Sequence, residues 1–417
     1  MFEVWYMRTI LHSDLNNFYA SCECLLNPDI KDKAVVVGGS QSDRHGVVLA
    51  KNYKAKSFGI KTGDTLFEAR QKCPDVVYVE AHFSVYQKYA KLVKDIYREY
   101  TDRIESFGID EAWLDVTESI NLFGSGEEIA EKIRKRVKEE IGLTVSIGVS
   151  YNKIFAKLGS DLKKPDAVTI ISPQNYMRVV WPLKVEELLY VGRATKKKLN
   201  DMAIYTIGDL ACTDENVLIS KFGKWGEYLY TYANGKDSSP VLKFNEENEI
   251  KSIGNSLTFY RDLTSNDDVK ALIYMLSESV SSRMKDDGKV FATTVRLWVV
   301  DKNLNSFVRQ TKIPASGLSS DIGKVAMQIF LDNYKWLAPV RGVGVSVCDF
   351  CNTHQLYIEE KSDKIQKLQN LESVVEDVRR RYGRQIINRA MMFKEARLVG
   401  LNIKEDHVIH PEAFHTS

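Results

Sequence analysis

The sequence predicts a multidomain α+β protein. The chain has 417 residues, and domains usually hold roughly 100–200 residues each, so more than one domain is expected. Strand and helix signals alternate over about residues 1–172, a helical stretch covers 173–240, and strands and helices return from Lys251. Alternation of this kind indicates layered α/β or α+β domains.

The composition excludes several classes of protein. Hydrophobic residues make up 44% of the chain and charged residues 27%, and 58 basic against 56 acidic side chains give a net charge of 58 − 56 = +2. A chain with this apolar fraction is not intrinsically disordered, collagen-like or a disulfide scaffold. The near-zero charge says nothing about nucleic acid, because basic and acidic faces can cancel.

The sequence carries no membrane or export signal. No apolar run reaches about 18 residues, and the N-terminus holds Glu3 and Arg8 without the apolar core of a secretory signal. We therefore expect a cytoplasmic protein whose six cysteines are reduced thiols.

The N-terminal region shows the alternation most clearly. Short apolar runs predict strands, and apolar residues that recur every four positions from Ile129 to Ile141 predict an amphipathic helix ended by Gly142. A last helix should stop before Pro165. The expected strands are residues 9–13, 34–37 and 143–149, and the expected helices are 129–141 and 154–162.

The C-terminal part has a separate set of elements. Asn234-Gly235 and the run 238–240 are turn-forming and indicate a linker. The tail from Glu359 reads as a charged helix that ends before Gly383. In between, we expect strands at 252–258, 292–300 and 343–350 and helices at 269–284 and 322–337.

Three acids stand in apolar, strand-like segments. Asp110 and Glu111 are adjacent inside one segment, and Asp14 lies at the end of another. Charges in such places are costly unless they are paired or bind a cation. In a straight strand Asp110 and Glu111 would face opposite sides, so a tight turn is needed to bring both to one edge. The alternative is that the pair only begins a turn.

Carboxylates from adjacent strand ends suit Mg²⁺, which takes a few of them and keeps the rest of its shell for water and phosphates. Two such ions a few ångströms apart are a general solution for nucleotidyl transfer. The pattern therefore favours Asp14, Asp110 and Glu111 as catalytic metal ligands.

Several motifs resemble one known family. The run from His12 to Ala20 resembles the first catalytic motif of the Y-family (DinB/UmuC-like) translesion DNA polymerases of the bacterial type, and the run from Gly108 to Asp115 resembles the central one. Further matches follow in the same order at 52–60, 145–153, 155–157, 163–165 and 251–254, so the similarity spans about residues 9–400.

The resemblance implies a right-hand polymerase with a small fingers region, a helical thumb and a C-terminal α/β little-finger domain. Its implied boundaries are 1–17 and 83–172 for the palm, 18–82 for the fingers, 173–240 for the thumb, 241–250 for a linker, 251–357 for the little finger and 358–417 for a tail.

The resemblance also implies roles at the active site. Asp14, Asp110 and Glu111, with the Leu15 carbonyl, would bind two Mg²⁺ ions. Tyr19 would be the steric gate that excludes a ribose 2′-hydroxyl, although a tyrosine here can also be a core aromatic. The residues expected to contact the dNTP are Asn17, Phe18, Tyr19, Tyr53, Lys56 and Lys164.

Two positions depart from the family pattern. Lys56 stands where Arg is common, which loses bidentate phosphate geometry, and Ala50 stands where a phosphate-contacting Thr is frequent. Lys164 has the alternative of a solvated lysine at a helix end.

DNA contacts are implied in the thumb and little finger. Residues 189–199 resemble a helix-hairpin-helix, although Arg193 replaces the usual second glycine, and the lysine run has the alternative of a solvated helix face. A sheet in the little finger would contact phosphates instead of bases. The residues expected to contact DNA are Gly192, Lys196, Lys197, Lys198, Arg296, Arg309 and Lys312.

A run after the last strand resembles a degenerate sliding-clamp peptide, with Gln355, Leu356 and Ile358 as the clamp-binding residues. An ordinary loop or edge strand is the alternative.

The expected activity is template-directed DNA synthesis with low fidelity and tolerance of damaged templates. The expected partners are primer-template DNA and dNTP, with a sliding clamp as a further candidate. We expect a monomer in the cytoplasm, associated with the nucleoid. The alternatives are another palm-type nucleotidyl transferase, or a DNA- and clamp-binding scaffold with weak or no catalysis.

Overall fold

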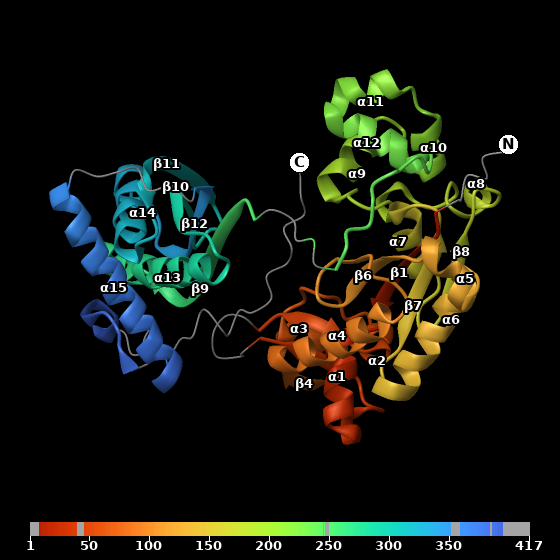
Figure 1. Ribbon diagram of the computed structural model, residues 1–417, viewed down its shortest axis with the longest axis horizontal. Coiled ribbons are helices and arrows are strands. Elements are labelled where there is room, and N and C mark those ends of the chain that lie inside the picture. The colour runs from red at the N-terminus through yellow and green to blue at the C-terminus, as the bar shows by residue number, and fades with distance from the viewer. Residues whose placement is uncertain are drawn as a thin grey trace. The chain divides into compact units, whose positions relative to one another are not determined.

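The computed structural model describes residues 8–39, 46–244, 246, 250–351, 359–383 and 386–394. These fall into two compact units, formed in the main by residues 8–39 and 47–246 and by residues 250–394. Each unit has its own sheets, helices and hydrophobic core (Figure 1).

A five-stranded sheet forms the centre of the first unit. The strand order is β5-β6-β1-β7-β8, and all neighbours are antiparallel except β7 and β8. The strands are β1 (Ile10–Leu15), β5 (Ile104–Ser106), β6 (Glu111–Asp115), β7 (Val145–Ser150) and β8 (Val168–Ile171).

The two faces of this sheet carry different side chains. Alternate residues of a strand point to opposite faces, so Leu11 and Leu15 pack in the core with the helices α4 (Phe83–Arg98) and α6 (Gly126–Arg136). Ile10, His12 and Asp14 lie on the face of α7 (Lys153–Leu162), which crosses β1 and β7. The predicted helix 129–141 is divided, because α6 ends at Arg136 and a π-helical turn, Val137–Ile141, follows. Between β6 and α6 lie a 3-10 turn, Thr117–Ser119, and the short α5 (Ile120–Phe123).

The segment expected as the fingers is small. A three-stranded sheet of order β3-β2-β4 has β2 antiparallel to β3 and parallel to β4. Its own core is a small cluster that includes Val36, Val48 and Ile60. The elements are α1 (Phe18–Leu26), a 3-10 turn (Pro28–Ile30), β2 (Val35–Gly38), β3 (Val48–Lys51), α2 (Tyr53–Ser57), α3 (Leu66–Lys72) and β4 (Val77–Glu80).

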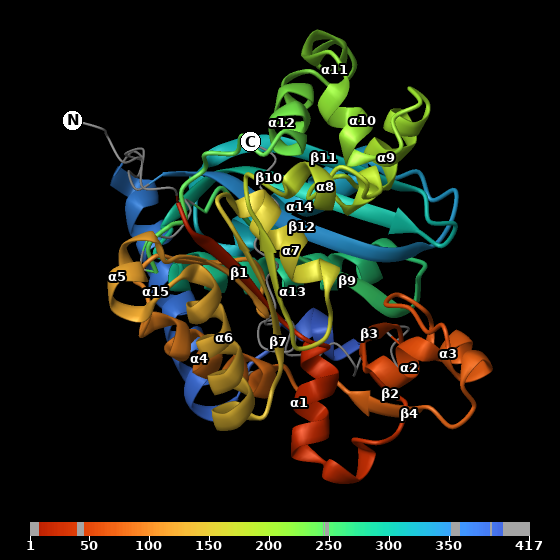
Figure 2. The ribbon, with the colours of Figure 1, turned by 90° about the vertical axis from the view of Figure 1, so that its right-hand side faces the viewer.

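The segment expected as the thumb is helical, as predicted. Figures 1 and 2 show α9 to α12 as a bundle at one end of the first unit and α1 to α3 at the other. Thr206 and Asp209 form a capping box that starts α10. The elements are α8 (Tyr176–Val179), a 3-10 turn (Val185–Glu187), α9 (Arg193–Asn200), α10 (Ile207–Cys212), α11 (Glu215–Phe222) and α12 (Lys224–Ala233).

The start of the expected linker is packed against the first unit. Val241 is 1% exposed and joins the cluster of Ile10 and Trp113. The Leu242 amide donates to Glu105 Oε2 over 3.1 Å, and the Arg98 guanidinium lies 3.5 Å from the ring centroid of Phe244. The chain is therefore packed against the first unit as far as Phe244.

The second unit is a four-stranded antiparallel sheet with two helices on one face. The order is β11-β10-β12-β9, and the buried residues of β10, such as Val295 and Leu297, pack with those of the helices. Sequence reasoning missed β11. The elements are β9 (Ser252–Leu263), α13 (Asn266–Asp286), β10 (Phe291–Asp301), β11 (Ser306–Ser316), α14 (Ser319–Asn333) and β12 (Val340–Cys351).

The charged tail helix α15 (Glu359–Tyr382) belongs to the second unit. Glu372 accepts hydrogen bonds from the Ser319 backbone and side chain, and Arg379 pairs with Glu278 at 3.0 Å. A 3-10 turn, Ala390–Lys394, follows and places Met392 in the core of this unit.

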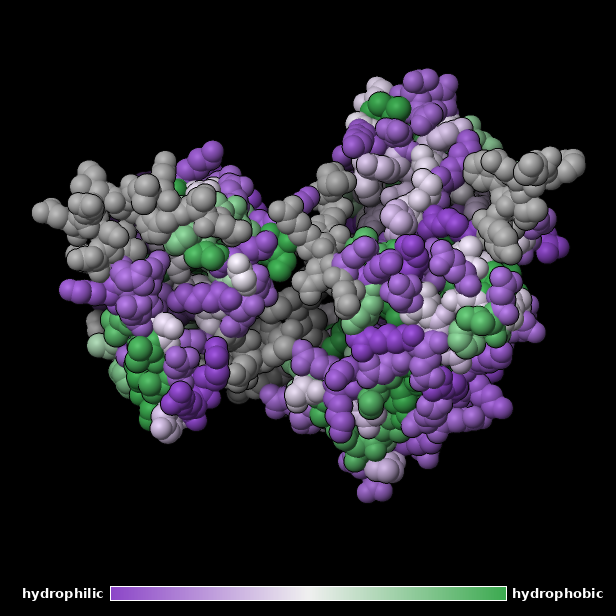
Figure 3. Space-filling view, in the orientation of Figure 1, coloured by the Kyte–Doolittle hydropathy of each residue, from purple (hydrophilic) through white to green (hydrophobic). Residues whose placement is uncertain are grey.

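The surface visible in Figure 3 is mostly hydrophilic, with small separate apolar patches. Among the described helices, none combines the length and the apolar character that crossing a membrane requires.

The close approach of α7 to β7 depends on Gly148. A Cβ atom at this position would lie 1.9 Å from the Ala156 carbonyl oxygen, which is backbone and cannot move aside. We expect Gly148→Ala to destabilise the first unit by about 3 kcal/mol or more, measured as the midpoint of urea unfolding. Gly192→Ala is the matched control, because a Cβ there meets nothing within 4 Å. Equal midpoints for the two variants would contradict this packing.

Candidate active site

The strand pair β1–β6 brings acids far apart in sequence to one place. Asp14 and Glu111 are direct partners in the register of the two strands. Asp110 occupies the bend just before β6, and its carbonyl accepts a hydrogen bond of 3.0 Å from the Leu15 amide. This bond ties the end of β1 to the start of β6, so all three acids and the Leu15 carbonyl lie at one edge of the sheet.

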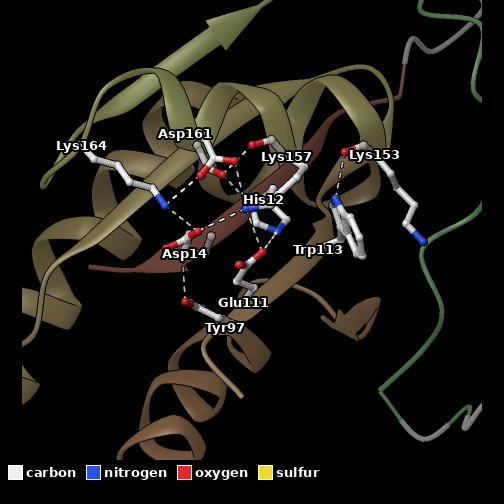
Figure 4. Close-up of polar contacts among 11 residues, drawn as sticks. His12, Asp14, Tyr97, Glu111, Trp113, Lys153, Lys157, Asp161 and Lys164 are labelled. Carbon is white, nitrogen blue, oxygen red and sulfur yellow. Dashed lines mark hydrogen bonds and ion pairs between the residues drawn. The ribbon is translucent and has the colours of Figure 1, made fainter. Parts of the chain in front are cut away.

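Two lysines reach these acids from α7 and the residues after it (Figure 4). Lys157 Nζ lies 3.3 Å from Asp14 Oδ2 and 2.9 Å from Glu111 Oε2. Lys164 Nζ lies 2.7 Å from the same Asp14 oxygen. Burial lowers the pKa of Lys157, but the charges of Glu111 and Asp14 raise it by more, so this side chain stays an ammonium at neutral pH.

His12 lies beneath Glu111 and is fully buried. Its Nδ1 is 2.9 Å from Ser160 Oγ on α7, and its Nε2 is 3.2 Å from Glu111 Oε2. Burial lowers the pKa of this imidazole, with Lys157 adding to the effect, so His12 is neutral. Glu111 Oε2 therefore lies between the His12 imidazole and the Lys157 ammonium, and the ion pair is with Lys157.

The donor set suits a divalent cation in its chemistry. All candidate ligands are hard oxygens, as Mg²⁺ prefers. Burial first, and then the charges of Glu111 and Asp14, raise the pKa of Asp110 to about 7, so an unpaired charge at this carboxyl is costly. In the described part of the chain, however, no three acidic, histidine or cysteine side chains form a ready metal-binding group. The ammonium of Lys157 lies instead on the oxygens of Asp14 and Glu111.

The raised pKa of Asp110 predicts a pH-dependent stability. The unfolded chain ionises this carboxyl near pH 4, whereas the folded protein does so near pH 7. Stability in metal-free buffer therefore falls as pH rises from about 4 to about 7, and we expect Asp110→Asn to recover on the order of 2–4 kcal/mol above pH 7 and nothing below pH 4. Urea unfolding in a chelator across this pH range measures it. Asp75→Asn, which removes an exposed carboxyl, is the control, and a gain from Asp110→Asn that did not vary with pH would contradict the cause.

The first turn of α1 lies next to the start of α2. Asn17 is the N-cap of α1 with a positive φ of 48°, and its amide, oriented to satisfy both partners, lies 3.3 Å from the Lys51 carbonyl and 3.3 Å from the Tyr53 amide. Burial raises the pKa of Tyr53, and Lys164 and Asp14 are close enough to act on it. Lys56 Nζ lies 5.8 Å from the Tyr53 ring centroid. The structure thus places Asn17 and Lys56 next to Tyr53, which lies in the neighbourhood of Lys164 and Asp14.

Tyr19 is held by other aromatic rings. Its ring stacks on Tyr86 with centroids 4.4 Å apart and an interplanar angle of 9°, and Phe83 meets it edge-on at 6.1 Å. The Tyr86 hydroxyl donates to the buried Glu23. Burial, and then the charge of Asp110, raises the pKa of Tyr19, so the ring lies near the acids. Phe18 is 3% exposed, which leaves mainly its backbone for a ligand.

Comparison with known proteins identifies the family of the chain. Residues 13–161 match the model of the impB/mucB/samB family, residues 250–360 match its C-terminal domain, and residues 187–237 match the DNA polymerase-iota thumb domain. The protein "DNA polymerase IV" of Acetivibrio thermocellus is 50% identical over 399 residues, which cover 95% of this chain and 99% of the relative. The chain belongs to the impB/mucB/samB family.

Further relatives extend the comparison. The "DNA polymerase IV 1" of Bacillus subtilis is 31% identical over 405 residues, which cover 96% of this chain and 97% of the relative. A solved Y-family DNA polymerase chimera of Dbh and Dpo4 has a TM-score of 0.72 and 25% identity, and the match covers 83% of this chain and all of the chimera. The predicted membership of the Y family of DNA polymerases and the right-hand fold are confirmed.

In this Y-family polymerase, the thumb residues expected to contact DNA differ in their exposure and in whether they already form an ion pair. Gly192 is exposed and is the N-cap of α9. Lys197 and Lys198 are exposed, but Lys196 Nζ is paired with Glu186 at 2.7 Å. Lys197 and Lys198 are therefore the lysines best placed to meet a phosphate.

The expected little-finger contacts of the polymerase lie on two faces. Arg296 Nε donates to Gln310 Oε1 across β10 and β11, and Lys312 pairs with Thr294, so both belong to the face away from the helices. Arg309 pairs with the core residue Leu297 and therefore lies on the opposite face. Gln355, Leu356 and Ile358 lie outside the described residues, so clamp binding stays a prediction.

Sequence reasoning did not assign roles to Lys157, Asp161 or Tyr86. Lys157 and Asp161 are four residues apart on α7 and pair at 3.1 Å, a spacing that was readable in the sequence. The contact of Lys157 with Asp14 could not be predicted from the sequence, because it depends on how α7 crosses β1.

Proposed function

We propose that this Y-family polymerase adds dNTPs to a primer 3′ end under the direction of a template, with Asp14, Asp110, Glu111 and the Leu15 carbonyl as ligands of two Mg²⁺ ions. The observation that carries the proposal is the β1–β6 register, which places Asp14 opposite Glu111 and joins Asp110 to Leu15. When bound, the two ions would activate the primer 3′-hydroxyl and neutralise the leaving pyrophosphate.

The chain's own residues would bind and orient the nucleotide. Tyr53, Lys56 and Lys164 would contact the triphosphate, together with the amides at the start of α1. Tyr19, fixed by its stack on Tyr86, would lie under the sugar and exclude a 2′-hydroxyl. Catalysis would rest on positioning and electrostatics and would need no protein base.

The same proposal assigns the domains. Residues 1–17 and 83–172 would be the palm, 18–82 the fingers, 173–240 the thumb, 251–357 the little finger and 358–417 a tail. Lys197, Lys198, Arg296 and Lys312 would bind the phosphates of primer-template DNA. The proposal includes a monomer that also binds a sliding clamp through Gln355, Leu356 and Ile358. It also includes association with the nucleoid.

The small fingers segment favours translesion synthesis. Its few short elements would make few contacts with the nascent base pair, and so would tolerate a distorted one. We expect the protein to extend a primer past an abasic site and to misincorporate on undamaged template, as seen by gel analysis of single-nucleotide extension. Normal extension on undamaged template with a complete stop at abasic and bulky lesions alike would contradict the bypass role.

A further inference from the structure

One ammonium group contacts three carboxylates in the active site. Lys157 Nζ lies 3.3 Å from Asp14, 2.9 Å from Glu111 and 3.1 Å from Asp161. The Lys157 side chain is only 12% exposed, and Figure 4 shows it among these acids. Lys164 approaches from the other side and shares Asp14 and Asp161, at 2.7 Å and 2.9 Å.

Lys157 uses the same oxygens that the proposed function gives to a divalent ion. Asp14 Oδ2 and Glu111 Oε2 face its ammonium, so a divalent ion that bound these two oxygens would be repelled by the Lys157 charge beside it. Without a cation, however, the two partly buried carboxylates would repel each other, because β1 and β6 hold them opposite one another. Lys157 therefore neutralises the pair that strand pairing creates.

Asp161 is an alternative ion-pair partner for the Lys157 ammonium. It lies one helical turn further along α7, and its side chain is 45% exposed, in contrast to Asp14 at 8%. The four-carbon stem of lysine is flexible, so the ammonium can leave Asp14 and Glu111 while keeping its contact with Asp161.

We propose that Lys157 is an internal counter-cation, a positioning residue that occupies the Asp14–Glu111 pair and moves onto Asp161 when a divalent ion takes its place. This inference rests on the proposed function and adds a consequence. A free metal ion must displace Lys157 and binds weakly, whereas an ion that arrives with a triphosphate brings negative charge that reduces its repulsion from Lys164 and from the displaced Lys157. Metal binding would thus be coupled to nucleotide binding.

Manganese titration of the full chain, without DNA or dNTP, tests the proposal. We expect Lys157→Met to bind Mn²⁺ about tenfold or more tightly than the unmodified protein, because the competing charge is gone. Asp161→Asn should bind it several-fold more weakly, since Lys157 loses its alternative partner, and Lys157→Arg should stay close to the unmodified protein. Lys72→Met, which breaks an ion pair with Asp64 on the fingers, is the matched control and should change nothing.

Two further measurements keep the result interpretable. Asp14→Asn combined with Lys157→Met should lose the gained affinity, which locates the ion at this site. The thermal midpoint of metal-free Lys157→Met should be lower than that of the unmodified protein and should rise more on adding Mn²⁺. Equal or weaker Mn²⁺ binding by a folded Lys157→Met, or no binding by either protein, would overturn the proposal.

Primer extension by the unmodified protein separates the two claims. If Mn²⁺ affinity responds to Lys157 as expected but no nucleotide is incorporated, the counter-cation stands and the proposed function fails. If nucleotides are incorporated but Mn²⁺ affinity does not respond to Lys157, only the counter-cation fails.

Discussion

Replacing Asp110 and Glu111 together by alanine is expected to abolish dNTP incorporation while primer-template DNA still binds. Glu111 starts β6 opposite Asp14, and Asp110 lies in the bend just before it. Without these two side chains the site loses two of its three carboxylates. A loss of at least about 10³-fold in the rate of single-nucleotide incorporation is expected, because charge on the transferred phosphate is no longer neutralised. Rapid-quench primer extension measures the rate, and fluorescence anisotropy of labelled DNA measures binding.

The control for this experiment must remove carboxylates outside the site. Asp95→Ala with Glu131→Ala removes two acids that pair with arginines on their own helices, α4 and α6, and it should leave incorporation unchanged. If the double variant incorporated dNTPs at a rate within tenfold of the unmodified protein, Asp110 and Glu111 would not be catalytic residues. Loss of DNA binding as well would mean that the pair supports the fold instead of the chemistry.

Much of the first unit could be predicted because each element carries its own pattern. The apolar run expected as a strand at 9–13 is β1, shifted by one or two residues, and the helix expected at 154–162 is α7. Gly142 does end the helical segment after Ile129, in the left-handed conformation expected of it. The π-helical turn before it could not be predicted, because nothing in the four-residue spacing distinguishes it from α-helix.

The strand β11 was missed for a physical reason. It is an edge strand, and most of its side chains are exposed, including Arg309, Gln310 and Lys312. Alternation of apolar and polar residues is therefore absent, and only pairing with β10 makes this segment a strand. The same register separates Arg309 from Arg296, which the one-dimensional sequence could not show.

The acidic residues of the active site could be predicted from the sequence, but the lysine that neutralises their charge could not. An acid in an apolar strand end is conspicuous because its burial is costly, so Asp14, Asp110 and Glu111 stood out. Lys157 did not, since one lysine on an amphipathic helix is ordinary. Its role appears only in the fold, where α7 packs closely on β1 and β7 because Gly148 of β7 has no side chain, so that Lys157 reaches Asp14 and Glu111.

Tyr19→Ala is expected to admit ribonucleotides. The Tyr19 ring cannot swing away from the site, because Tyr86 stacks on it and Phe83 meets it edge-on. If this ring lies under the sugar, removing it opens the space that a 2′-hydroxyl needs. Discrimination between dNTP and rNTP, measured as the ratio of kcat/KM values for single-nucleotide insertion, should fall by roughly 100-fold.

Tyr19→Phe is the matched variant, because it keeps the ring and removes only the hydroxyl. It should retain the discrimination of the unmodified protein, since exclusion by shape needs the ring and not a hydrogen bond. Tyr19→Ala that kept full discrimination while still inserting dNTPs would show that Tyr19 is a core aromatic. A fall in discrimination with Tyr19→Phe as large as with Tyr19→Ala would instead assign the selection to the hydroxyl, and the stacked geometry of Tyr19 and Tyr86 would then not explain it.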